Sequence, residues 1–417
     1  MKNKALSIIY YFQIVFFIVI GGIVSGQKVK SGLEVLAGNN FDIVRGKRAG
    51  LITNPTGVDS KLRSGIDLLF RAEGVKLVAL FSPEHGVRGD FSAGETIGTE
   101  KDSTTGLPVY SLYGKTRKPT KEMLSGIEVL IYDIQDIGSR SYTFISTLGL
   151  AMEAAAENNI PFVVLDRPNP LGGVRMEGPL VKPGFVSFVS QFPVPYIHGL
   201  TVGELANYLN NEGLLSKGVK CDLKVVKMAG WSRNMLFSDT GLPWVPSSPH
   251  IPHISTSLYY PATGILGELY VVSIGVGYTM PFELFAAEWI DAEKLSSAMN
   301  SLNLPGLIFR PVHYKPYYSV LTGKAIQGVQ IHIIDPVKAP LTLIQFYLMQ
   351  ETHKLWPDKN LFAMCEKSRL DMFDKVCGTD QVRLKFVESF KVSSIEQLWT
   401  AEIPAFRKKA EKYFLYK

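Results

Sequence analysis

Apolar segments of strand length alternate with helix-length segments along the first half of the sequence, and this alternation limits the folds open to the chain. Strands are expected at 49–58, 75–86, 127–138 and 160–170. Helices are expected in the segment SGIDLLFRAEG and at 141–159. Because strands that are apolar on both faces are typical of a parallel sheet covered by helices, we expect an α/β fold built on a parallel sheet.

The polar residues of this half lie where the expected strands end. They are Asn54, then Glu84 with His85, Asp133 with Asp136, and Asp166 with Arg167. In an open parallel sheet the carboxyl ends of the strands share one edge, and ligands bind in the crevice there. The alternation therefore predicts a site formed by these residues, although the needs of turns also make strand ends polar.

Three of these strand ends each allow a functional and a structural interpretation. In SPEHGVRG, Glu84 is a fixed carboxyl group that could act as a general acid, or could cap backbone N–H groups of the turn. In DIQDIGSRSYTF, Asp136 and Arg140 precede a helix whose start could bind an anion or a sugar hydroxyl, or Asp136 could cap this helix. In DRPNPLGG, Arg167 could bind a substrate carboxylate or pair with Asp166.

The N-terminal segment, 1–26, has the layout of a secretory signal. Lys2 and Lys4 precede the apolar stretch 5–24, and small residues follow around Gly26. This stretch is also long enough to span a bilayer, so a retained membrane anchor is the alternative. Both interpretations predict a periplasmic or secreted protein that meets a membrane only through this segment, if it is not cleaved.

Charge and cysteine usage give no support for several classes of partner. Lys and Arg number 44 and Asp and Glu 38, a net charge of +6 without a basic stripe interleaved with aromatic residues, so we expect no nucleic acid. The three cysteines show no CxxC or zinc spacing. His250 and His253 form an HxxH without a third ligand, and SIGVGYTM lacks the third glycine of a dinucleotide site. We therefore expect no metal and no cofactor.

Many short segments occur in an order that resembles one family of bacterial enzymes. They are SPEHGVRG, VYSLYG, DIQDIGSRSYTF, DRPNPLGG, EGPL, HGLTVGELA, WVPSSPHIP, YPATG and PFE, followed by FDKVCGTD and FLYK. The chain resembles the NamZ-type exo-β-N-acetylmuramidases from Ala49 to its end. Such proteins are exported and release terminal N-acetylmuramic acid from peptidoglycan fragments. The resemblance implies a Rossmann-like catalytic domain over 27–300 and a smaller C-terminal α/β domain over 301–417.

The same resemblance implies roles for individual residues. The family's catalytic glutamate lies in SPEHG and falls on Glu84, which would protonate the leaving oxygen. The second catalytic group could be Asp136, Asp166 or the acetamido group of the substrate. His85 would position Glu84 or a sugar hydroxyl. The expected substrate-binding residues, with Arg140 and Arg167 as partners of the lactyl carboxylate, are Asn54, Arg140, Asp166, Arg167, His250 and Glu268.

One segment departs from the family pattern. Where the family tends to have EGTN and then Gly-Arg-Gly-Thr before PFE, this chain has ELYVVSIGVGYTMPFE. Glu268 is retained, but Val271 and Val276 occupy the Asn and Arg positions. We expect an exported muramidase that acts on muropeptides. Because an Arg is a natural partner of a lactyl carboxylate, its loss motivates two alternatives: a non-catalytic binder of cell-wall sugars and a hydrolase of a related amino sugar.

Overall fold

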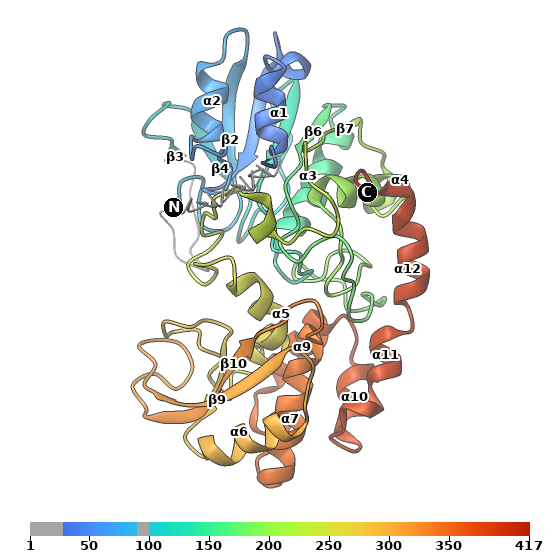
Figure 1. The fold of residues 1–417 in the computed structure, drawn as a ribbon. Helices are drawn as coiled ribbons and strands as arrows, with labels where there is room; N and C mark the ends of the chain where they lie inside the picture. Colours follow the sequence, from blue (N-terminus) through green and yellow to red (C-terminus); the bar gives the residue numbers. More distant parts are fainter. Residues whose placement is uncertain (1–27, 90–99) are drawn as a thin grey trace, which may run out of the picture.

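The computed structural model describes residues 28–89 and 100–417, so the expected signal sequence or membrane anchor lies outside the described residues. No helix within these two ranges is long and apolar enough to cross a membrane. Figure 1 shows two α/β domains, one above the other, each with its own sheet.

The upper domain contains a seven-stranded sheet, which confirms the expected α/β fold with a mostly parallel sheet. Its strand order is β3-β4-β2-β1-β5-β6-β7, and only the short β3 runs antiparallel to its neighbour. The strands are β1 (Arg48–Thr53), β2 (Lys76–Ser82), β3 (Glu100–Lys101), β4 (Pro108–Ser111), β5 (Val129–Asp133), β6 (Phe162–Leu165) and β7 (Leu223–Val226).

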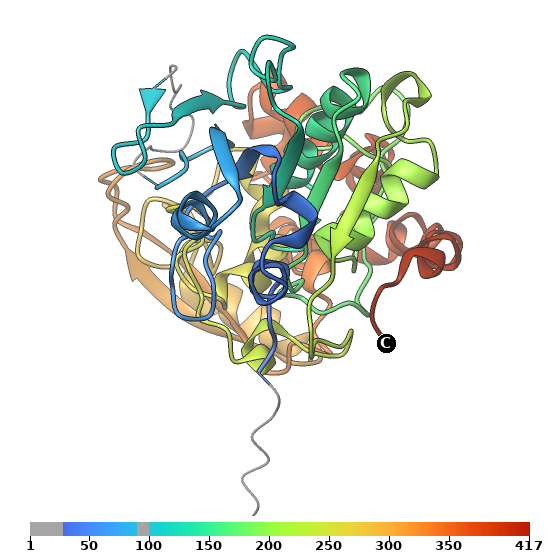
Figure 2. The same cartoon turned by 90° about the horizontal axis from the view of Figure 1, so that it is seen from above.

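Helices cover both faces of this sheet, as Figure 2 shows from above. One face packs on α1 (Gly32–Gly38) and α2 (Gly65–Arg71). The other packs on α3 (Phe144–Glu157) and α4 (Val202–Asn211). Alternate residues of the central strands point to opposite faces of the sheet. Ile131 packs in the apolar cluster with α1 and α2, and Tyr132 packs in the apolar cluster with α3 and α4. Burial on both faces is the reason that the strands read as continuous apolar runs.

The lower domain contains a three-stranded antiparallel sheet in the order β8-β10-β9. Its strands are β8 (Leu284–Ala287), β9 (Leu307–Tyr314) and β10 (Ile326–Ile333). Its helices are α5 (Thr256–Gly267), α6 (Ala292–Ser301), α7 (Ile344–Leu355), α8 (Leu361–Met364), α9 (Lys367–Cys377), α10 (Gln381–Val387) and α11 (Glu396–Thr400). Short 3-10 helices complete both domains: η1 (Asp42–Val44), η2 (Ser216–Gly218), η3 (Phe237–Thr240), η4 (Leu341–Leu343), η5 (Val392–Ser394) and η6 (Glu411–Tyr413).

In the structure, the boundary between the two domains lies before residue 300, the position expected from the sequence. β8 precedes that residue but pairs with β10, and α5 packs against α7 and α9. The second domain therefore begins near α5. The four-residue β8 follows a glycine-rich segment and gives too short a pattern to be assigned from the sequence.

The end of the chain returns from the lower domain to the upper one. Helix α12 (Ile403–Ala410) runs along the side of the molecule, and the C-terminus lies beside α4 (Figure 1). The backbone N–H of Leu415 donates to Glu204 on α4, and the hydroxyl of Tyr416 donates to Asp166. The chain thus joins the two domains at α5 and again at α12.

Candidate active site

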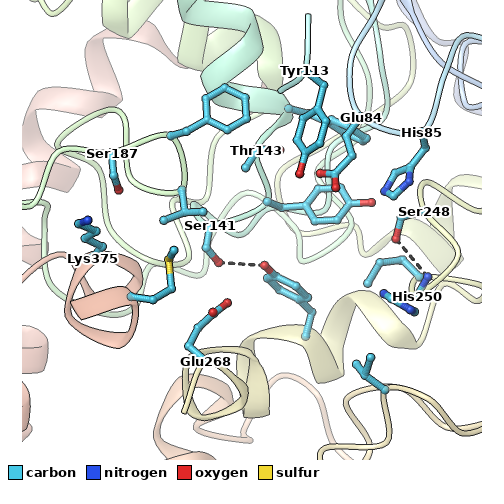
Figure 3. A pocket seen from close by; sticks show the side chains of 18 of the residues that line it. Glu84, His85, Tyr113, Ser141, Thr143, Ser187, Ser248, His250, Glu268 and Lys375 are labelled. Carbon is cyan, nitrogen blue, oxygen red and sulfur yellow. Dashed lines mark hydrogen bonds between the residues drawn. The ribbon is translucent and has the colours of Figure 1, made fainter. Parts of the chain in front are cut away.

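A cavity of about 650 Å³ lies between the two domains, and both of them line it. The upper domain contributes Glu84 and His85 from the end of β2 and the segment 141–144 that leads into α3. The lower domain contributes Glu268 from the end of α5 and Lys375 from the end of α9. Figure 3 shows these side chains around one central space. The crevice expected at the carboxyl ends of the strands therefore exists, and the second domain closes it.

The turn after β2 directs Glu84 into this cavity. His85 and Gly86 both adopt the left-handed conformation, with φ of 77° and 82°, so the chain reverses directly after Glu84. Tyr113, which follows β4, lies beside Glu84 in the cavity wall (Figure 3). Burial, and then the charge of Glu84, raise the pKa of Tyr113 to about 12. Tyr113 is therefore a neutral phenol whose hydroxyl group borders the glutamate.

Two histidines form the side of the cavity next to Glu84 (Figure 3). His85 is buried, and the Nε2 atom of His250 lies 3.0 Å from the hydroxyl of Tyr318. Burial, and then the charge of His85, lower the pKa of His250. His250 is therefore neutral at pH 7 and can accept or donate a hydrogen bond to a sugar hydroxyl.

Glu268 lies on the opposite side of the cavity from Glu84 (Figure 3). Burial raises the pKa of its carboxyl group, while the charge of Arg369 acts in the opposite direction. Tyr260 also lines the cavity, with its hydroxyl 3.0 Å from Ser141 Oγ. Glu84 and Glu268 are the two carboxyl groups among the lining residues that the structure describes. The cavity thus brings together Glu84, His85, His250 and Glu268 of the residues expected from the sequence.

Asp136 and Asn54 do not line the cavity. Asp136 Oδ2 accepts a hydrogen bond from the backbone N–H of Gly138 at 2.7 Å and lies 3.5 Å from His198 Nε2. Asn54 Oδ1 accepts from the backbone N–H of Thr56 at 3.0 Å. Both side chains are buried and hold their own turns, which is the structural interpretation of polar strand ends.

Arg167 also differs from its expected role. Its guanidinium forms a bidentate pair with Asp133, with Nε–Oδ1 and Nη2–Oδ2 distances of 2.6 and 2.9 Å. Both side chains are buried between β5 and β6. The partner of Arg167 is thus on the neighbouring strand rather than the adjacent Asp166, and its guanidinium is unavailable to a substrate in the cavity.

Asp166 is fully buried and fixes the end of the chain to the upper domain. It accepts hydrogen bonds from Thr201 Oγ1 at 2.8 Å, from the backbone N–H of Gly203 at 2.8 Å and from the hydroxyl of Tyr416 at 2.6 Å. Burial raises the pKa of Asp166 to about 7, and the three donors oppose this shift. The expected substrate-binding role of Asp166 is therefore replaced by a structural one.

We expect Asp166 to make the protein less stable as the pH rises from 3.8 to about 7. Between these values the unfolded chain has released a proton that the folded chain keeps. The stabilising contribution is complete below pH 3.8 and is lost as the pH rises through about 7. In Asp166→Asn, the free energy of unfolding should fall less steeply over this window, as measured by urea denaturation.

Asp102→Asn is the matched control for this prediction. The hydrogen bond from Arg88 lowers the pKa of Asp102 to about 2, so its titration lies below the window. Its loss should lower stability by a constant amount between pH 5 and 7 without changing the slope there. A slope for Asp166→Asn equal to that of the wild type would contradict the assignment.

Arg140, which was expected to bind the substrate, instead forms hydrogen bonds to both domains. Its side chain is fully buried, and burial lowers its pKa to about 10. It donates to Ser190 and to two carbonyl groups of the upper domain, and to two carbonyl groups at the end of α9. The acceptors are Ser190 Oγ, Pro179 O, Val194 O, Val376 O and Cys377 O, at 2.6–3.2 Å.

Several lining residues were not assigned to the site from the sequence. Tyr113 and Lys375 occur in VYSLYG and FDKVCGTD, two segments that carry the family resemblance but hold no strand-end acid. Arg117 stacks on Phe188, with 4.4 Å from its Cζ atom to the ring centroid. Val276 also lines the cavity. A search for cations within the family segments would have found Lys375.

Comparisons with known proteins agree with this arrangement. Residues 49–255 match the N-terminal domain, and residues 258–416 the C-terminal domain, of exo-β-N-acetylmuramidase NamZ. The peptidoglycan β-N-acetylmuramidase NamZ of Bacillus subtilis (strain 168) is 43% identical over 389 residues, which cover 93% of this chain and 92% of the relative.

Two crystal structures of DUF1343 family proteins from Bacteroides fragilis NCTC 9343 have the same fold. One is 57% identical with a TM-score of 0.90 and covers 94% of this chain and 99% of its own. The other is 26% identical with a TM-score of 0.74, and the match covers 93% of this chain and 99% of the other chain. The likeness extends over both domains.

Proposed function

The chain belongs to the NamZ family of exo-β-N-acetylmuramidases, a family of glycosidases, and on this premise we propose that it removes a non-reducing terminal N-acetylmuramoyl residue from peptidoglycan fragments. The observation that carries the proposal is the pair of carboxyl groups, Glu84 and Glu268, on opposite sides of one cavity. Export to the periplasm or the medium is part of the proposal and rests on the layout of residues 1–26.

Glycoside hydrolysis ordinarily needs two carboxyl groups that flank the scissile bond. We assign proton donation to Glu84: its proton passes to the glycosidic oxygen as the bond to C1 breaks, and water supplies the new hydroxyl group on C1 while its other proton passes to a carboxylate of the site. Asp136 and Asp166, the two acids considered as the second group, are buried, hydrogen-bonded and outside the cavity lining. Glu268 takes this role, because it is the other carboxyl group among the lining residues.

The raised pKa of Glu268 gives a competing assignment that an experiment can decide. A carboxyl group whose pKa is raised by burial suits proton donation, and this would exchange the roles of Glu84 and Glu268. A general acid matters most when the leaving group is a poor one, such as a sugar hydroxyl, and little when it is a nitrophenolate. A base or nucleophile is needed with both leaving groups.

We expect Glu268→Gln to lower kcat by about 10²–10⁴-fold on both a disaccharide and a 4-nitrophenyl muramoyl glycoside, because the variant lacks the second carboxylate. The measurement is kcat on the two substrates at one pH. A loss confined to the disaccharide would give the role of general acid to Glu268. Turnover at the wild-type rate on both would remove Glu268 from the mechanism and favour participation of the acetamido group.

A panel of 4-nitrophenyl glycosides tests the function itself. We expect release of nitrophenolate from the β-N-acetylmuramoyl glycoside and much slower release from the β-N-acetylglucosaminide. The reverse preference would identify a hydrolase of a related amino sugar. Binding of muropeptides without any product would identify a sugar-binding protein, the alternative motivated by Val276 in the cavity wall.

A further inference from the structure

The last turn of α9 brings a lysine into the wall of the cavity. Lys375 and Met372 line it from the lower domain, and Lys375 is half-buried. Among the described residues Lys375 forms no ion pair, although its neighbour Asp374 pairs with Arg383 at 2.7 Å. A lysine that lines a cavity and has no internal partner is available to pair with an anion that enters the cavity.

A hydroxyl group without a partner lies on the same side of the cavity. Ser187 Oγ is buried and has no hydrogen-bond partner among the residues that the structure describes. Figure 3 shows Ser187 and Lys375 together, across the cavity from His85 and His250. The ammonium group of Lys375 and the hydroxyl group of Ser187 thus offer two donors from one side of the cavity, which suits a carboxylate.

The other cations near the site have partners elsewhere. Arg140 donates to four carbonyl groups and a serine, and Arg167 pairs with Asp133. Arg117 is exposed and its guanidinium stacks on Phe188. Val276 adds only apolar surface to the wall. Lys375 is therefore the lining cation with the fewest competing contacts in the described structure.

Arg140 holds the end of α9 in place. Its Nη2 atom donates to the carbonyl groups of Val376 and Cys377, the two residues that follow Lys375, at 2.9 Å each. Gly378 ends the helix with φ of 86°, and a Cβ atom there would lie 2.8 Å from Nη2. The loop that carries Arg140 continues directly into cavity residues 141–144. This contact sets the position of Lys375 relative to the upper domain.

We propose that Lys375, together with Ser187, binds a carboxylate on the terminal sugar and so determines specificity, and that Arg140 is a positioning residue for Lys375. The inference rests on the proposed function and names the group that recognises the acidic substituent, which in N-acetylmuramic acid is the lactyl ether. N-acetylglucosamine is the same sugar without this substituent, so it provides the matched ligand.

Calorimetric titration with free N-acetylmuramic acid and N-acetylglucosamine tests the role of Lys375 without turnover. We expect Lys375→Met to weaken binding of N-acetylmuramic acid about 10- to 100-fold, the cost of a lost charged hydrogen bond, and to leave N-acetylglucosamine unchanged. Lys375→Arg should recover part of the affinity. Unchanged affinity for N-acetylmuramic acid in Lys375→Met would overturn the inference, whether or not the wild type cleaves a muramoyl bond.

The positioning role of Arg140 is tested with Arg140→Lys. The affinities of this variant for N-acetylmuramic acid and for N-acetylglucosamine are measured below the melting temperature of the variant, and their ratio is compared with that of the wild type. A loss of folded protein lowers the apparent number of sites for both sugars equally and leaves the ratio unchanged. Displacement of Lys375 lowers the affinity for N-acetylmuramic acid alone. A ratio equal to that of the wild type would limit Arg140 to a structural role.

Discussion

Glu84→Gln is expected to lower kcat on a muramoyl–glucosamine disaccharide by about 10²–10⁴-fold, because the glycosidic oxygen then leaves without a proton donor. Glutamine keeps the shape of the side chain and can still pack beside Tyr113, so KM should change little. On a 4-nitrophenyl muramoyl glycoside the loss should be much smaller, since that leaving group departs without protonation. The measurement is kcat and KM on both substrates.

Glu288→Gln is the matched control for this variant. Glu288 pairs with Lys324 at the surface and does not line the cavity, so its replacement should leave both activities unchanged. Equal turnover by Glu84→Gln and the wild type on the disaccharide would remove the catalytic role from Glu84.

Arg140→Met is expected to lower the free energy of unfolding by at least about 3 kcal/mol. Five acceptor groups lose their donor, and four of them are backbone carbonyl groups that are buried between the domains. Methionine fills part of the space but donates no hydrogen bond. The measurement is urea denaturation of the wild type and the variant, followed by circular dichroism.

Arg310→Met makes the same chemical change at an exposed position. Arg310 bonds only to Gln330 on the neighbouring strand in the described structure, so its loss should cost less than about 0.5 kcal/mol. If Arg140→Met lowered the free energy of unfolding as little as Arg310→Met does, the domains would be held together by apolar packing alone.

The strand ends show how far the sequence could predict the site. The ends of β1, β2, β5 and β6 do lie along one edge of the sheet, as the alternation indicates. Of their polar residues only Glu84 and His85 reach the cavity. The sequence contains no signal for this difference. A polar residue at a strand end looks the same in the sequence whether its side chain faces a cavity or is hydrogen-bonded within the protein. Asp133 and Arg167 pair across two strands whose adjacency only the fold determines.

The strand pattern alone could not predict the lower wall of the site. Glu268 was assigned only through the resemblance, and Lys375 lies nearly 300 positions after Glu84 at the end of a polar helix. Their approach to Glu84 depends on how the domains pack, which Arg140 and the returning C-terminus control. The same long-range contacts explain why Arg140 and Asp166, both in family segments, are structural here.

The most direct measurement of the central claim compares two disaccharides with the unmodified protein. One carries N-acetylmuramic acid at the non-reducing end, β-1,4-linked to N-acetylglucosamine, and the other has the reverse order. We expect free N-acetylmuramic acid from the first, detected by mass spectrometry, and no cleavage of the second. Absence of product from the first, or equal cleavage of both, would contradict the assignment as an exo-acting muramidase.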